Sequence, residues 1–187
     1  MAVISTRSVL AVMYLVGHAF VQASSLQPIT IATTPNGFDS AARGWNSFPL
    51  QANGAINSTF KFNQANVISQ CGELAGSLAA AGYKYCSLDS GWSAGSNGDE
   101  YGRIIYDDTV FDIPTLADYL HSRGLLLGVY VLPGAFINDE QKTILNTNTT
   151  IGSVCSGDDD LARCNFDYTQ EAVQVWHNSV VNQFASW

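Results

Sequence analysis

The chain of 187 residues is short of positive charge, because eight Lys and Arg residues stand against sixteen Asp and Glu. It also contains no cluster of Lys or Arg. Nucleic-acid binding depends on such a cluster to neutralise phosphates. The composition therefore excludes a nucleic-acid partner, and the acidity suits a secreted protein that handles neutral ligands such as sugars.

No apolar run is long enough to predict a membrane span. The apolar stretch near the N-terminus, residues 8–21, is too short for one and is interrupted by Gly17 and His18. It follows Arg7 and ends at Val21-Gln22-Ala23, an order that is typical of a cleaved secretion signal. We therefore predict a signal peptide over residues 1–23, secretion, and no membrane partner.

The predicted mature chain covers residues 24–187. Without Arg7 it has seven basic and sixteen acidic residues, a formal charge of −9. Two N-glycosylation sequons, at Asn57 and Asn148, fall in segments that are predicted as loops. Both agree with secretion.

Cysteine and histidine are few, and no pair of them has the spacing of metal ligands. No metal or other cofactor is therefore predicted. Four cysteines in an oxidising compartment favour disulfides. Cys155 and Cys164 enclose a short polar loop, and a disulfide between them is the first expectation. Cys71 and Cys86 fall on a helical face and in a buried strand, so each is also compatible with a small apolar core residue.

Apolar periodicity along the chain alternates between strand and helix, which predicts a parallel α/β architecture. Strands are expected to end near residues 44–48 and to cover 83–88 and 125–131, the last buried on both faces. Helices are expected after each strand, with Asn63 and Asp167 as N-caps and Asp112-Ile113-Pro114 opening the second helix. No clear element is predicted for residues 50–62, 90–108 or 132–166. The predicted buried helix positions are Val67, Cys71, Leu74, Ala75, Leu78, Ile113, Leu116, Ala117, Leu120, Val173, Trp176, Val180, Val181 and Phe184.

A dinucleotide site is not predicted, since no Gly-x-Gly-x-x-Gly follows the first strand. Instead, the first strand ends in Gly44-Trp45-Asn46-Ser47, and residues 82–92 and 102–130 follow with matching order and spacing. Together these stretches resemble glycoside hydrolase family 27, the α-galactosidases and α-N-acetylgalactosaminidases, whose catalytic domain is a (β/α)8 TIM-type barrel. The resemblance implies a carbohydrate substrate, with retaining hydrolysis of terminal α-linked galactose by the full-length form.

The resemblance also implies substrate-binding residues at the ends of the strands. Trp45 would form an apolar wall against the sugar ring, although a barrel-core tryptophan is the alternative. Asp89 would accept hydrogen bonds from sugar hydroxyls, although it is also compatible with a loop cap. Trp92 and Tyr130 would border the same site.

Ser90 departs from the family, which places a second carboxylate at this position. A hydroxyl lacks the charge and reach of a carboxylate. An α-glucan hydrolase of the isomaltose type is therefore the alternative substrate reading. The family also joins a cysteine of the loop after the third strand to one after the fourth strand, so Cys155 has a second candidate partner.

Neither catalytic aspartate of the family is matched in this sequence. The nucleophile belongs to the fourth strand and the acid/base residue follows the sixth, whereas the chain contains three βα units. We therefore expect a truncated barrel with no catalytic residue, inactive alone, and a carbohydrate-binding remnant is the alternative. Three units cannot close an eight-stranded barrel. The sequence predicts no oligomeric state.

Overall fold

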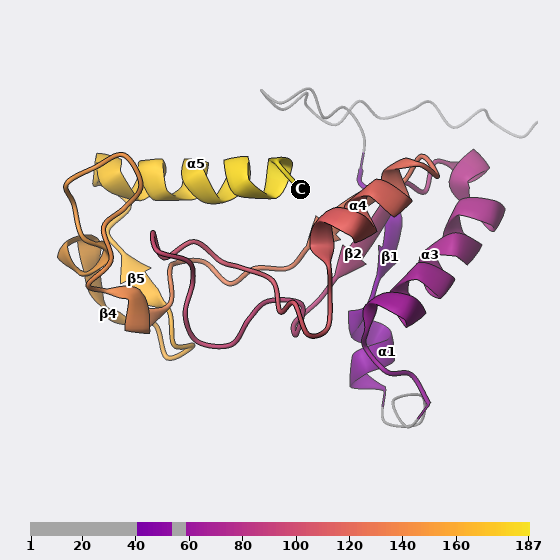
Figure 1. Cartoon of the computed structure of the whole chain (residues 1–187), viewed down its shortest axis with the longest axis horizontal. Helices are drawn as coiled ribbons and strands as arrows, with labels where there is room; N and C mark the ends of the chain where they lie inside the picture. The colour runs from indigo at the N-terminus through magenta and orange to yellow at the C-terminus, as the bar shows by residue number, and fades with distance from the viewer. Residues whose placement is uncertain (1–40, 54–58) are drawn as a thin grey trace, which may run out of the picture. The chain divides into compact units, whose positions relative to one another are not determined.

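The computed structural model describes residues 41–53 and 59–187 (Figure 1). The predicted signal peptide and the sequon residue Asn57 lie outside the described residues. Within them, no helix is long and apolar enough to cross a membrane.

Three parallel strands form the central sheet in the order β1 (Gly44–Asn46), β2 (Tyr85–Leu88) and β3 (Leu126–Val129). Trp45 lies opposite Cys86, and Cys86 lies opposite Leu127. Parallel strands need a crossover between them, and here the crossovers contain helices α3 (Gln64–Ser77) and α4 (Ile113–His121). The predicted parallel α/β architecture is confirmed for this part of the chain.

The helices α3 and α4 lie beside the sheet (Figure 1) and bury an apolar cluster against it. A disulfide joins Cys71 of α3 to Cys86 of β2, so these two cysteines are paired core residues. Most of the predicted helix positions are buried, but Leu78 is largely exposed because α3 ends at Ser77, before it. The buried members of this first cluster are Val67, Cys71, Leu74, Cys86, Leu88, Trp92, Ile104, Phe111, Ile113, Leu116, Leu120 and Leu125.

One of the two predicted helix caps is confirmed, and Asp112, which was predicted to open its helix, caps it as well. The Asn63 side chain accepts a hydrogen bond from Asn66 N at 3.0 Å, and Asp112 accepts one from Thr115 N at 3.2 Å. Such bonds satisfy amides that have no partner within the helix. The prediction for Asp167 is wrong. Its carboxylate accepts from Thr169 two residues on, and helix α5 (Glu171–Ala185) begins only after Gln170.

The segment between β3 and α5 contains structure that the sequence did not predict. Strands β4 (Cys155–Asp158) and β5 (Cys164–Phe166) pair antiparallel, after short 3-10 turns at Ile137–Asp139 and Ile151–Val154. A disulfide joins Cys155 to Cys164 across this hairpin, the pairing expected first. The hairpin packs against α5 (Figure 1) through a second apolar cluster, which contains Ala135, Ile144, Ile151, Val154, Cys164, Phe166, Val173, Trp176 and Val180.

Gly134 allows the backbone before the hairpin to approach strand β5 closely. Its φ is +88°, and a β-carbon there would collide with the carbonyl oxygen of Cys164. Glycine is the residue that meets both conditions without strain. The backbone of Ala135 then accepts a hydrogen bond from Cys164 N at 2.8 Å, which fixes the loop to β5.

Four further expectations are corrected. Residues 48–52 form a short helix, α1 (Phe48–Ala52), where a loop was expected from residue 50. The segment 90–108, whose glycines and charges predict a polar loop outside the core, contains the buried side chains of Trp92 and Ile104. Strand β3 is not buried on both faces, since Leu126 is 43% exposed, and Val181 of α5 is exposed as well.

Two leucines test the position of the core. Leu120 is fully buried in the first cluster, whereas Leu126 is largely exposed. We expect Leu120→Ala to lower the free energy of unfolding by about 2–5 kcal/mol, because it loses burial and leaves a cavity. Leu126→Ala is the matched control and should cost less than about 1 kcal/mol. Urea denaturation followed by circular dichroism measures both, and equal losses would contradict the described packing.

The cap of α4 also predicts a pH dependence. Hydrogen bonds from the side chain and backbone of Thr115 hold the pKa of Asp112 below its usual 3.8. A lowered folded-state pKa stabilises the protein above the unfolded-state pKa, and this contribution is lost as the pH falls through the folded-state pKa. We expect wild type to be more stable than Asp112→Asn at pH 7, with the gap closing below about pH 4. Thermal unfolding across pH 2–7 measures the gap, and a constant gap would contradict this role.

Candidate functional site

Ser47 joins the carboxyl ends of β1 and β2. Its hydroxyl accepts a hydrogen bond from Asp89 N at 2.8 Å and donates one to Gln51 Oε1 at 2.6 Å. Gln51 in turn donates from Nε2 to Ser90 O at 2.8 Å. Ser47 is fully buried. The backbone of Asp89 and Ser90 is thus held by side chains of the neighbouring strand end and of α1.

Asp89 is partly buried, and its carboxylate faces its own turn. Oδ1 accepts hydrogen bonds from Ser90 N at 2.8 Å and from Ser90 Oγ at 3.3 Å. This arrangement includes the loop-cap geometry that was the alternative reading. A carboxylate has about four acceptor positions, so capping leaves Asp89 able to accept from further donors.

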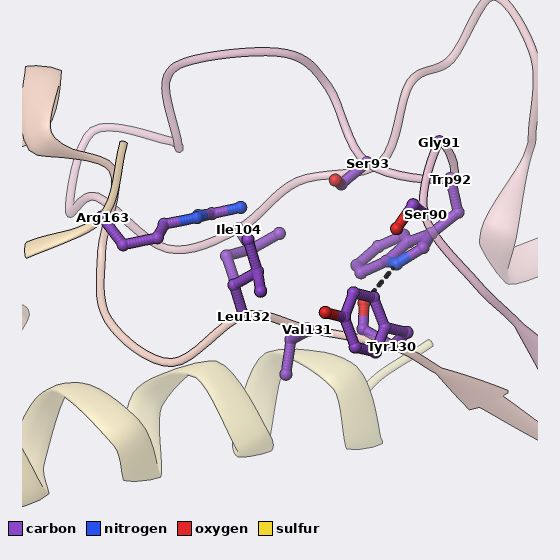
Figure 2. Close-up of a pocket in the computed structure, with 9 residues that line it drawn as sticks. All are labelled: Ser90, Gly91, Trp92, Ser93, Ile104, Tyr130, Val131, Leu132 and Arg163. Carbon is purple, nitrogen blue, oxygen red and sulfur yellow. Dashed lines mark hydrogen bonds between the residues drawn. The ribbon is translucent and has the colours of Figure 1, made fainter. Parts of the chain in front are cut away.

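A pocket of about 150 Å³ lies beside these strand ends (Figure 2). Trp92 forms its inner end, where the indole Nε1 donates to the carbonyl oxygen of Tyr130 at 2.7 Å. Trp92 is only 1% exposed, and its ring packs edge-on against Phe184 and Trp187. Its clearest role is therefore to hold Tyr130. The pocket is lined by Ser90, Gly91, Trp92, Ser93, Ile104, Tyr130, Val131, Leu132 and Arg163.

The aromatic side chains of β1 and its extension face different surroundings. Trp45 is partly buried and packs against the first apolar cluster, and it lies opposite Cys86, which is bonded to α3. Its surroundings are those of the barrel-core alternative. Phe48, three residues on, is 57% exposed at the carboxyl end of β1. The structure thus places an exposed aromatic ring beside Ser47 that sequence reasoning missed.

Of the predicted substrate-binding residues, the structure brings Ser90, Trp92 and Tyr130 together around the pocket. Asp89 precedes Ser90 and contacts it. Trp45 does not line the pocket. Asn148, the second predicted glycosylation site, is exposed.

A buried ion pair lies in the segment between β3 and β4. Asp139 is fully buried and pairs with Lys142 at 2.5 Å. Its Oδ2 accepts from Gly98 N at 2.7 Å, and Lys142 Nζ donates to Gly98 O at 2.9 Å. Sequence reasoning did not single out either residue. Their three-residue spacing, one helical turn, is the signal that could have found them.

Arg163 was also missed. It is 7% exposed, and its guanidinium carbon lies 3.6 Å from the centre of the Phe136 ring. Burial lowers its pKa, while the charges of Asp159, Asp139 and Tyr130 oppose that shift. For metals, no group of three or more His, Cys, Asp or Glu side chains that could hold an ion occurs within residues 41–53 and 59–187.

A parallel sheet with helical crossovers and polar residues at the carboxyl ends of its strands is found in barrel enzymes and in other α/β proteins. Comparison with solved structures agrees. A candidate α-N-acetylgalactosaminidase from Bacillus halodurans C-125 matches with a TM-score of 0.68 at 22% identity, over 83% of this chain and 40% of that one. An isomalto-dextranase from Arthrobacter globiformis T6, solved with panose, matches with a TM-score of 0.57 at 25% identity, over 76% of this chain and 26% of that one.

The sequence comparisons are more specific. The melibiase family model described as Alpha galactosidase A matches residues 51–143. Alpha-galactosidase 3 of Hypocrea jecorina is 47% identical over 172 residues, which cover 87% of this chain and 28% of that relative. The chain belongs to the α-galactosidase family, glycoside hydrolase family 27. It spans less than a third of the length of Alpha-galactosidase 3 and of a candidate alpha-galactosidase 8 from Emericella nidulans.

The Ser47 contacts give a test of the site's construction. Ser47→Ala leaves the Asp89 amide without its acceptor in a buried position. Such a loss costs about 1–3 kcal/mol. We expect the variant to lose this much stability and the Asp89 and Ser90 amides to exchange faster with solvent. Ser90→Ala, at an exposed position, is the control and should change stability by less than about 0.5 kcal/mol. Hydrogen exchange and urea denaturation measure both, and unchanged exchange in Ser47→Ala would contradict this role.

Proposed function

We propose that this chain supplies the substrate-binding half of the catalytic domain of a secreted retaining glycosidase, which removes terminal α-linked galactose. The observation that carries the proposal is the 47% identity to alpha-galactosidase 3 over 87% of the chain. The site supports it, because a carboxylate, a hydroxyl and two aromatic side chains lie together at the carboxyl ends of β2 and β3.

Within this proposal, Asp89 accepts hydrogen bonds from hydroxyls of the terminal sugar, since a charged acceptor makes a strong directional bond. Tyr130, 43% exposed, supplies a polar edge of the site. The apolar face of the sugar stacks on an aromatic ring. Trp45 is the residue that the family resemblance implies for this stacking, and the exposure of Phe48 favours Phe48 as a second candidate.

The bond-breaking step requires two opposed carboxylates about 5–5.5 Å apart. We assign no residue of this chain to that step, and we propose that the 187 residues alone are inactive. The carboxylates near the pocket support this assignment. Asp139 is engaged by Lys142 and Gly98, and Asp159 accepts from the amides of Leu161 and Arg163.

We also propose that the three described parallel strands belong to a closed (β/α)8 barrel. The matches to solved family structures over 76–83% of this chain support it. Secretion, with a signal over residues 1–23, is supported by two disulfides, which persist in oxidising compartments. The exposed Asn148 is compatible with glycosylation there.

An α-glucan substrate is the second candidate, and Ser90 favours it. Its hydroxyl lies 3.3 Å from Asp89 Oδ1. This strand end therefore has one carboxylate and one hydroxyl, where the resembled family has two carboxylates. The isomalto-dextranase match supports the same reading. In the two candidates, the Asp89 carboxylate accepts a hydrogen bond from a different hydroxyl of the terminal sugar.

Calorimetric titration of the chain with galactose and with glucose tests the proposal. We expect galactose to bind, and Asp89→Asn to weaken its binding by about tenfold or more, because the variant loses a charge-assisted hydrogen bond. Asp108→Asn, at an exposed position away from the pocket, is the matched control and should bind as wild type does.

Preferential binding of glucose would favour the α-glucan candidate, and binding of neither sugar would contradict both. Hydrolysis is assayed on the intact secreted protein with α-galactosides and isomalto-oligosaccharides. Proton NMR of the first-formed anomer tests retention, and an inverted product would overturn that part of the proposal.

A further inference from the structure

Arg163 has a buried guanidinium nitrogen, Nη1, for which no described residue supplies an acceptor. Its backbone is fixed in the β4–β5 hairpin, where Arg163 N donates to Asp159 Oδ1 at 3.1 Å and Arg163 O accepts from Asp159 N at 2.9 Å. The guanidinium carbon lies over the Phe136 ring, 3.6 Å from its centre. Its Nη1 has no hydrogen-bond acceptor within the described residues. A buried donor without an acceptor is uncommon in folded proteins.

The other arginines of the described chain differ from it. Arg103 forms an ion pair and a hydrogen bond with Asp99, and Arg43 donates to the carbonyl oxygen of Ala81. Arg123 is exposed over the ring of Tyr119. Arg163 therefore combines burial with an unused donor.

The charges around Arg163 indicate what kind of group it lacks. The carboxylates of Asp159 and Asp139 lie close enough to favour its charged form, and an arginine side chain stays protonated in proteins. Asp159 and Asp139 therefore balance part of the charge of Arg163. Its Nη1 donor still has no acceptor within the described residues. The missing group is an acceptor oxygen, and a neutral hydroxyl satisfies that need without bringing a further charge.

The pocket determines where this oxygen comes from. The guanidinium points into the pocket from the side opposite Trp92 and Tyr130, with Ile104 and Leu132 between them (Figure 2). A terminal sugar held at the strand ends beside Ser90 and Tyr130 occupies the far end. A hydroxyl of the same ligand that reaches Arg163 therefore belongs to the next sugar unit.

We propose that Arg163 binds a hydroxyl of the sugar unit on the leaving-group side, and that it selects α-linked disaccharides over the free monosaccharide. This inference rests on the proposed function. Nη1 is itself covered, so the bond forms with a small rotation of the guanidinium over the Phe136 ring. The planar fork of arginine holds the hydroxyl oxygen directionally, which a lysine ammonium would not.

The test is calorimetric titration of the chain with galactose and with melibiose, in which galactose is α-linked to a second sugar. Arg163→Met keeps the apolar contact with Phe136 and removes the donors. We expect it to weaken melibiose binding about tenfold and to leave galactose binding unchanged within about twofold. Arg163→Lys keeps the charge and should also weaken melibiose. Arg123→Met, outside the pocket, is the matched control.

Thermal unfolding of each variant separates binding from folding. If Arg163→Met does not fold, Arg163→Lys decides the question, and melibiose affinity equal to wild type would overturn the proposal. Equal weakening of galactose and melibiose in a folded variant would also overturn it, because Arg163 would then act on the terminal sugar. Wild type that binds neither sugar would contradict the proposed function itself, whereas galactose binding with no effect of Arg163 would contradict this inference alone.

Discussion

The buried hydroxyl of Ser47 is the interaction on which the candidate site depends. Adjacent parallel strands pair through their backbones, but the residues that follow each strand have no such partner. Ser47 supplies one for Asp89, and Gln51 supplies one for Ser90. The pairing below it needs Gly44, since a β-carbon there would collide with the carbonyl oxygen of Tyr85. These contacts fix the backbone of Asp89, and the amide and hydroxyl of Ser90 then hold its carboxylate.

Two apolar clusters support the residues that line the pocket. The first joins α3 and α4 to the sheet and includes Trp92 and Ile104. The second joins the β4–β5 hairpin to α5 and includes Cys164, the neighbour of Arg163. Each cluster contains a disulfide, and Phe184 of α5 packs against both. The strand ends and the hairpin therefore reach the pocket from two apolar clusters that Phe184 connects.

Local patterns in the sequence predicted the parts of the fold that local forces determine. Asn63 caps its helix as predicted because the amide that it satisfies lies three residues away, and the buried faces of α3 and α4 follow helical spacing. Asp167 failed because Thr169 competes for the same carboxylate at shorter range. The hairpin was missed because its strands are short. The close contact of Gly134 with Cys164, which positions it, also joins residues thirty positions apart. Trp92 and Arg163 are buried by Phe184 and Phe136, which are distant in sequence, so no local pattern marks either as a pocket residue.

Ser90 shows how the site can relate to more than one sugar. Its backbone amide and its hydroxyl both contact Asp89 Oδ1. Ser90 therefore orients the Asp89 carboxylate. A second carboxylate at position 90 would instead compete with Asp89 for the same hydrogen-bond donors. A site rejects a wrong sugar mainly through buried polar groups that the wrong sugar leaves unpaired. With one carboxylate at this strand end, fewer acceptors are left unpaired when one hydroxyl of the ring changes orientation. Selectivity then depends more on contacts further from the strand ends, and the buried guanidinium of Arg163 is the polar group that the pocket offers there.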